Sequence, residues 1–162
     1  MAATPLTLIH VLISVIGLLT GAVMLLGFLN NKRLDGWNAV FLATTVLTSV
    51  TGYFFPFHKL LPSHILGAIS LVALSIAIVA RYARQMAKAW RRTYLIFAML
   101  AFYLNAFVLV AQLFMKVPAL HALAPTQSEP PFAITQVILL IFFLAVSILA
   151  VVRFREPASV SG

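Results

Sequence analysis

Two histidines are the side chains of this sequence best suited to chemistry, because an imidazole can ligate haem iron, copper or zinc. His10 lies inside the first long apolar segment, and His64 lies at the start of the third. Three uncharged polar residues in the apolar segments, Ser14, Gln112 and Gln136, could add hydrogen bonds to a ligand. We take these five residues as a candidate ligand-binding site, with His10 and His64 as its candidate haem or metal ligands.

Three interpretations of this polar set stay open. Its members can simply hydrogen-bond across helices and hold a bundle together. They can form a cofactor site, in which His10 and His64 ligate a b-type haem or a metal ion beside Phe54, Phe55 and Phe57. They can also form a small-molecule or quinone pocket, in which histidine and glutamine donate hydrogen bonds to a carbonyl group. The sequence does not decide which cofactor, if any, is bound.

Composition excludes several kinds of chemistry. The chain has no cysteine, so it can form no disulfide, thiolate metal site, iron–sulfur cluster or covalently attached haem. Its three acidic residues, Asp35, Glu129 and Glu156, all fall outside the apolar segments. Proton-coupled transport and cation conduction usually need carboxylates within the membrane, and hydrolytic chemistry usually needs a carboxylate pair or a metal. We therefore expect no catalytic residues, and a small-solute transporter or channel is only the third choice of function.

Long apolar segments separated by short charged gaps make up most of the chain. Of its 162 residues, 63% are hydrophobic and 9% are charged, and the mean hydropathy is +1.09. A helix needs about 20 apolar residues to cross a bilayer. We predict an all-α integral membrane bundle of five transmembrane helices, at about 6–29, 37–55, 61–82, 94–115 and 132–152. They form one domain, residues 1–156, followed by a short mobile tail at 157–162.

The basic residues indicate how this bundle is oriented. All but two of the 11 lysines and arginines fall in gaps on one side of the predicted membrane, and only Lys59 and Lys116 fall on the other. Basic loops stay in the cytoplasm, so we place the N-terminus outside and the C-terminus in the cytoplasm. The same rule explains the net charge of +8 without nucleic acid as a partner.

This orientation gathers the candidate site in the outer leaflet. His10 and His64 lie near the outer ends of their helices, and Gln112 and Gln136 lie about one turn below the outer ends of theirs. His58 and His121 fall in the outer loops above them, and the sequence leaves open whether these two join the cluster. Polar side chains at this depth normally face the interior of a bundle.

Two further sets of residues have predicted roles, one in helix packing and one in lipid contact. Gly17 and Gly21 form a G-x-x-x-G motif that would let another helix approach closely. Five basic residues between the third and fourth helices are predicted to contact anionic lipid headgroups on the cytoplasmic side: Arg81, Arg84, Lys88, Arg91 and Arg92. Because the first three share one helical face, this linker either continues as a basic amphipathic helix or is a plain cytoplasmic loop.

Parts of the sequence resemble a group of small bacterial membrane proteins to which no activity is attached. The similar segments are 34–37 (LDGW), 44–52 (TTVLTSVTG), 54–57 (FFPF) and 124–132 (APTQSEPPF). The resemblance implies a multi-pass protein of the bacterial inner (plasma) membrane and carries over no site residues.

From these observations we expect a non-catalytic subunit or accessory protein that packs against other membrane subunits, or against copies of itself, within a larger complex. A respiratory or other redox complex is the context we favour. The alternative is a haem- or quinone-binding electron-transfer protein that uses the same five-residue site.

Overall fold

The computed structural model describes residues 4–55 and 62–155, and every regular element in these two ranges is helical. The predicted crossing around His58 and the predicted tail at 157–162 lie outside the described residues. The elements, in chain order, are α1 (Pro5–Leu29), α2 (Asp35–Gly52), α3 (Pro62–Ile78), a π-helical turn η1 (Val79–Ala83), α4 (Trp90–Lys116), α5 (Pro118–Leu123) and α6 (Pro130–Arg153).

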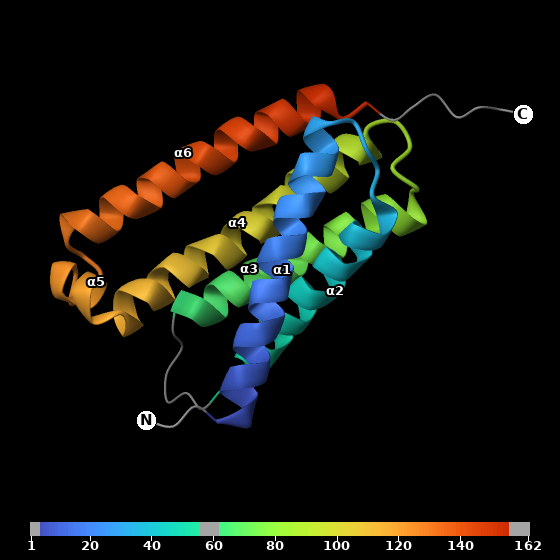
Figure 1. The fold of residues 1–162 in the computed structure, drawn as a ribbon. Helices are drawn as coiled ribbons and strands as arrows, with labels where there is room; N and C mark the ends of the chain where they lie inside the picture. The colour runs from blue at the N-terminus through green and yellow to red at the C-terminus, as the bar shows by residue number, and fades with distance from the viewer. Residues whose placement is uncertain (1–3, 56–61, 156–162) are drawn as a thin grey trace, which may run out of the picture.

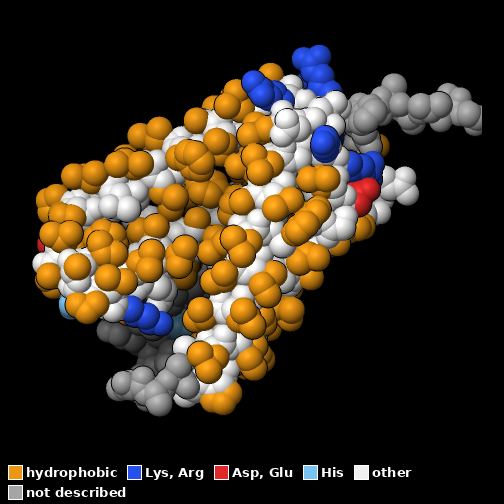
Figure 2. Space-filling model, viewed as in Figure 1, with side chains coloured by type: hydrophobic (Ala, Val, Ile, Leu, Met, Phe, Trp, Pro, Cys, Tyr) orange, Lys and Arg blue, Asp and Glu red, His pale blue; other side chains and the backbone are white. Residues whose placement is uncertain are grey.

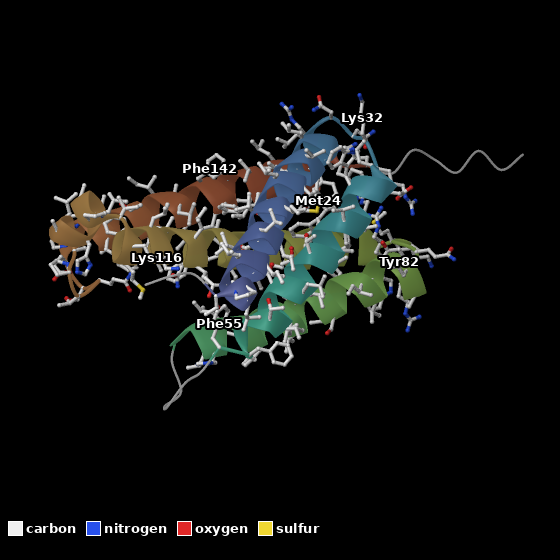
Figure 3. All side chains as sticks on the ribbon, turned by 60° about the horizontal axis from the view of Figure 1, so that its bottom comes forward. Met24, Lys32, Phe55, Tyr82, Lys116 and Phe142 are labelled. Atoms are coloured by element: carbon white, nitrogen blue, oxygen red, sulfur yellow. The ribbon has the colours of Figure 1, made fainter. Side chains whose placement is uncertain are left out.

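The five long helices run antiparallel to their neighbours in the chain (Figure 1). α1 packs on α2, α2 on α3, α3 on α4, and α4 on α6. We call the end that holds the start of α1 the His10 end and the opposite end the Arg81 end. Figure 3 shows Phe55 and Lys116 toward the His10 end and Lys32 and Tyr82 at the Arg81 end. α1 also packs on α6, and at the Arg81 end the ring of Phe28 lies 5.1 Å from that of Phe154, the residue just after α6.

Among the described residues, four helices are long and apolar enough to cross a membrane, which is the character of an integral membrane protein. They are α1, the continuous segment His64–Ala83, α4 and α6. α2 has 18 residues, a length of about 27 Å, but it is less apolar because it contains Asp35, Asn38 and several hydroxyl side chains. The predicted helix bounds agree with the observed ones to within a few residues.

The polar groups of α2 are paired inside the bundle. Asn38 is fully buried, and its amide donates to the carbonyls of Arg33 (3.0 Å) and Leu34 (2.9 Å). The hydroxyl of Tyr94 donates to the Asn38 carbonyl oxygen. Thr45, also buried, donates to the Phe41 carbonyl at 2.7 Å. Because these donors are satisfied within the protein, α2 can lie among apolar helices without leaving a polar group unpaired.

Gly17 and Gly21 form a close contact within the chain. A Cβ atom at Gly21 would lie 2.8 Å from the ring of Phe102 in α4, and one at Gly17 would lie 3.3 Å from Asn105 Nδ2. The Phe102 ring is itself held edge-on by Phe143 at 5.0 Å. The glycine face therefore serves the approach of α4 to α1, which is a close helix approach of the kind that the motif predicts.

The position of Arg81 contradicts its predicted contact with lipid headgroups. Its side chain is not a lipid-headgroup contact, because the residue is only 3% exposed, forms an ion pair with Asp35, and lies 4.9 Å from the centre of the Tyr94 ring. The π-helical turn η1 carries Arg81 into the interior, where Asp35 and Tyr94 compensate its charge.

The linker after η1 is not an amphipathic helix. Gln85, Met86 and Lys88 have positive φ angles, between 51° and 53°, so the chain turns here. Arg84 stacks on Trp90 at 5.2 Å and is exposed, as are Lys88 and Arg92, whereas Arg91 is partly buried. The loop interpretation therefore holds, and the helical alternative was wrong.

Replacing Gly21 by alanine should destabilise the bundle, because the new methyl group would overlap a phenyl ring that Phe41 and Phe143 hold in place. We expect a loss of about 1–3 kcal/mol in the free energy of unfolding, measured by thermal unfolding in detergent micelles. Gly36→Ala is the matched control, since nothing lies within 4 Å of the position its Cβ would take. Equal stability of the two variants would contradict the proposed contact.

Candidate functional site

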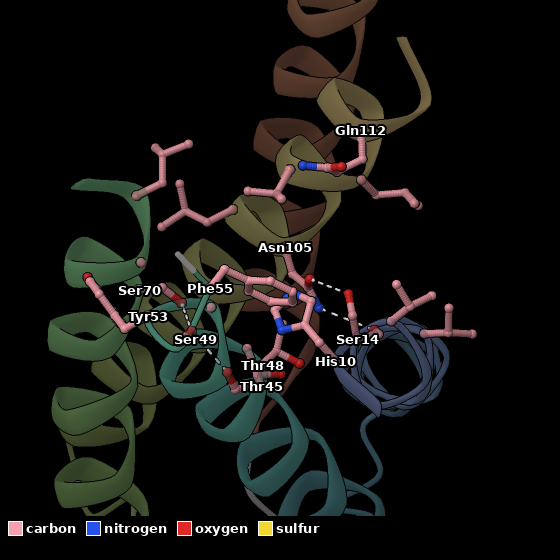
Figure 4. Close-up of a pocket in the computed structure, with 18 of the residues that line it drawn as sticks. His10, Ser14, Thr45, Thr48, Ser49, Tyr53, Phe55, Ser70, Asn105 and Gln112 are labelled. Atoms are coloured by element: carbon pink, nitrogen blue, oxygen red, sulfur yellow. Dashed lines mark hydrogen bonds between the residues drawn. The ribbon is translucent and has the colours of Figure 1, made fainter. Parts of the chain in front are cut away.

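A cavity of about 600 Å³ lies between α1, α2, α3 and α4 in the half of the bundle toward the His10 end (Figure 4). Four of the five predicted site residues line it: His10, Ser14, His64 and Gln112. This volume is within the range of about 300–1,000 Å³ that small-molecule sites usually have. The structure thus brings together side chains from three helices that are far apart in the sequence.

Gln136 is not among the residues that line this cavity. It is buried on α6, where its amide Nε2 donates to the Phe107 carbonyl at 3.2 Å. Its Oε1 is buried and has no hydrogen-bond partner among the described residues. The predicted depth agrees with that of the other residues, but α6 packs on a different side of α4. Sequence spacing indicates depth along a helix and does not indicate which neighbour the side chain faces.

His10 is held in one tautomer by α2. Its Nδ1 lies 2.8 Å from Thr51 Oγ1, and Thr51 donates its only hydroxyl proton to the Leu47 carbonyl at 2.7 Å. Nδ1 must therefore carry the proton of a neutral imidazole and donate it to Thr51. Nε2 is then the ring nitrogen with a free electron pair. The ring edge also packs on Phe55, with centres 5.2 Å apart.

His64 lies on the opposite wall, at the start of α3. The residue is buried, and its ring centre lies 5.7 Å from that of Tyr53. The Tyr53 hydroxyl donates to the His64 backbone carbonyl at 2.6 Å, which joins the end of α2 to the start of α3. The two histidines thus approach the cavity from α1 and α3.

Ser14 pairs with Asn105, a residue that the sequence analysis did not include in the site. The Ser14 hydroxyl donates to Asn105 Oδ1 at 3.1 Å, and Asn105 Nδ2 donates to the Ser14 carbonyl at 3.4 Å. Asn105 is buried and lines the cavity. Its position seven residues before Gln112, two helical turns on one face, was the signal that could have included it.

Hydroxyl side chains of α2 and α3 form the wall opposite α1. Thr48 and Ser49 line the cavity from α2, and Ser70 lines it from α3, with Ser49 Oγ and Ser70 Oγ 3.3 Å apart. Thr48 also donates to the Thr44 carbonyl at 2.8 Å. A threonine-rich helix is more often read as a packing feature, so sequence spacing alone gave no reason to include these residues.

Apolar side chains line the side of the cavity between α1 and α4. Val11 and Val15 of α1, and Leu109 and Leu113 of α4, border the cavity while also being 38–46% exposed. Figure 2 shows a hollow in the surface between α1 and the α4–α6 side. Lys116, at the end of α4, lies at the rim. The cavity is therefore bordered on this side by exposed apolar residues.

Residues predicted near the cluster in the loops stay away from the cavity. His121 is exposed on the short helix α5 and does not line the cavity. Glu129 accepts hydrogen bonds from the Thr126 hydroxyl (2.8 Å) and from the backbone amides of Thr126 and Ser128. These bonds, that of the Thr126 hydroxyl first, lower the pKa of the Glu129 carboxyl, which therefore stabilises its own turn. His58 lies outside the described residues.

Within residues 4–55 and 62–155, no group of three or more histidine, aspartate or glutamate side chains could together hold a metal ion. A haem or metal bound here would have to rely on His10 and His64, with other ligands supplied by the cofactor or by water. The tautomer of His10 suits such a role, because metal-binding histidines usually donate their other N–H to a neighbouring acceptor.

Compared with protein-family models, curated proteins and solved structures, the chain shows no match. The resemblance to a group of bacterial membrane proteins therefore stays a prediction. The functional argument rests on the geometry of the cavity.

Proposed function

We propose that the protein crosses the bacterial inner membrane five times, with its N-terminus outside and its C-terminus in the cytoplasm. Its basic side chains support this orientation, since all the described lysines and arginines except Lys116 belong to the Arg81 end of the bundle or the chain segments there. Figure 2 shows most of the visible ones gathered at that end. The internal pairing of Asn38 and of the α2 hydroxyls supports a crossing by α2 as well.

Single cysteines can check this topology, because the chain has none of its own. We expect Phe54→Cys, between α2 and α3, to react with a membrane-impermeant maleimide in intact cells whose outer membrane has been made permeable. Lys32→Cys, between α1 and α2, should react only after the inner membrane is opened. Both positions are exposed, so they differ in side and not in accessibility. Labelling of both from the same side would show that α2 does not cross.

We further propose that the cavity binds a small lipid-soluble organic molecule from the outer leaflet. The observation that carries this proposal is the cavity itself, which joins a polar wall on α2 and α3 to exposed apolar residues on α1 and α4. Cross-helix hydrogen bonding explains the pair Ser14–Asn105, but it does not require an empty volume of about 600 Å³ beside the pair. Protein interiors otherwise contain few voids larger than a water molecule.

The role of an accessory subunit has less support in the structure. One support for that expectation was the glycine face as a packing surface, and Phe102 of the same chain covers Gly21. The exposed apolar side chains of α6, such as Ile138 and Ile141, suit contact with lipid tails equally well. Ligand binding is therefore the function that the geometry favours over assembly into a redox complex.

A cavity-filling substitution tests ligand binding. Val108→Trp should occupy the cavity from α4, whereas Ile96→Trp, at an exposed position on the same helix, is the matched control. The proteins are extracted with their surrounding lipid in styrene–maleic acid particles, and organic extracts are compared by mass spectrometry. We expect one compound, near one per protein, in the wild type and in Ile96→Trp and its loss in Val108→Trp. The absence of any enriched compound in the wild type would contradict the proposal.

A haem or metal centre is the second candidate, favoured by the Nδ1–H tautomer of His10 and by the buried position of His64. Such a centre predicts a reduced-minus-oxidised visible spectrum with a haem signature, or a stoichiometric metal, in the gently purified protein. His10→Ala and His64→Ala should each abolish it, and His121→Ala, on exposed α5, should not. A colourless, metal-free wild-type protein would remove this candidate.

A further inference from the structure

We propose that the molecule in the cavity is an uncharged amphiphile that donates a hydrogen bond through a hydroxyl group, of the phenol or quinol type, and not a carbonyl compound such as a quinone. This inference rests on the proposed ligand-binding function and specifies its ligand. It follows from where the hydroxyl protons of the α2 wall are already committed.

The hydroxyl groups of α2 have no proton left to give to a ligand. Thr45 donates to the Phe41 carbonyl at 2.7 Å, and Thr48 donates to the Thr44 carbonyl at 2.8 Å. A backbone carbonyl can only accept, so the direction of these bonds is certain. Ser49 likewise lies 3.0 Å from the carbonyl of Thr45 as its donor. Each oxygen therefore presents its remaining lone pair, and the α2 wall accepts hydrogen bonds.

Three neighbouring side chains, Ser14, Tyr53 and His10, have also committed a proton. The Ser14 proton goes to Asn105 Oδ1, and the Tyr53 proton goes to the His64 carbonyl. The His10 Nδ1 proton goes to Thr51, so Nε2 is an acceptor too. A ligand carbonyl placed against these groups would meet lone pairs on both sides, whereas a ligand hydroxyl would find several acceptors within one cavity.

The charge and the shape of the cavity restrict the class of ligand further. The cavity lining, taken over the described residues, contains no Asp or Glu and includes Lys116, so an ammonium donor would meet a like charge and no counter-charge. Donors also line the cavity, but away from α2: the Ser70 hydroxyl on α3, the second amide proton of Asn105, and Gln112 and Lys116 toward the outer end of α4. The Phe55 ring suits an aromatic head, and exposed apolar residues such as Leu113 suit an alkyl chain that extends into the bilayer.

A matched pair of probes tests whether the bound molecule donates a hydrogen bond through its hydroxyl group. 4-Octylphenol and 4-octylanisole differ in whether the ring oxygen carries a proton or a methyl group. Their dissociation constants are measured by calorimetry on the full-length protein in dodecyl maltoside micelles, with empty micelles subtracted. We expect the wild type to bind the phenol about tenfold more tightly, the effect of one net hydrogen bond in an apolar site.

Two variants assign the preference to the cavity. The double variant Thr48→Val, His10→Phe removes two of the acceptors while keeping side-chain bulk, and it should bind both probes with nearly equal affinity. Thr44→Val is the matched control, because Thr44 makes the same bond to its own helix, to the Val40 carbonyl, but is not among the lining residues. It should keep the tenfold preference. Thermal unfolding of each variant confirms that the bundle is intact.

The possible outcomes distinguish failure of the donor inference from failure of the proposed ligand-binding function. Equal binding of phenol and anisole by the wild type, or tighter binding of the anisole, would overturn the donor inference and leave ligand binding in place. A tenfold preference that persists in the double variant would overturn it as well, because the proton would then be received elsewhere. Failure of the wild type to bind either probe up to its solubility limit would count against both the donor inference and the proposed cavity function.

Discussion

The structure depends on one constraint: a hydrogen-bond donor surrounded by hydrocarbon cannot bond to water and must find its acceptor within the protein. α2 is the helix that meets this constraint most often. Its threonines and serines donate to carbonyls one turn earlier in the same helix, and Asn38 is enclosed by two backbone carbonyls and the Tyr94 hydroxyl. Arg81 meets the same demand through Asp35 and the face of Tyr94. These pairings let the most polar helix occupy a place between α1 and α3.

The same pairings give the cavity its chemical character. α1 and α4 are held together at Gly21 and Phe102 and again at Ser14 and Asn105, so the bundle is tightly packed toward the Arg81 end. Beyond Ser14 the cavity extends along α1 as far as Thr7 and along α4 as far as Lys116. On α2 the cavity meets hydroxyl oxygens whose protons are already donated to backbone carbonyls. Because the hydroxyl protons of α2 are donated to carbonyls of the same helix, the face of α2 toward the cavity presents hydrogen-bond acceptors.

Much of the fold followed from hydropathy, since each predicted helix lies close to an observed one. The site could be predicted from the sequence less completely than the fold. Depth along the helices brought His10, Ser14, His64 and Gln112 together, but only packing could show that Gln136 faces Phe107. The burial of Arg81 depends on the π-helical turn that contains it, and no local sequence pattern predicts that turn. Likewise, the contact between His10 Nδ1 and Thr51 is a tertiary one, so sequence spacing could not show which ring nitrogen is left for the cavity.

α6 contributes none of the residues that line the cavity, although the ring of Phe143 supports Phe102 behind it. Most of its remaining surface is apolar and exposed. If the cavity binds a ligand as proposed, selection on ligand fit acts on α1 to α4, whereas selection for bilayer thickness and lipid composition can act on α6 separately. Drift in α6 would then adapt the chain to a different host membrane without changing the residues that line the cavity.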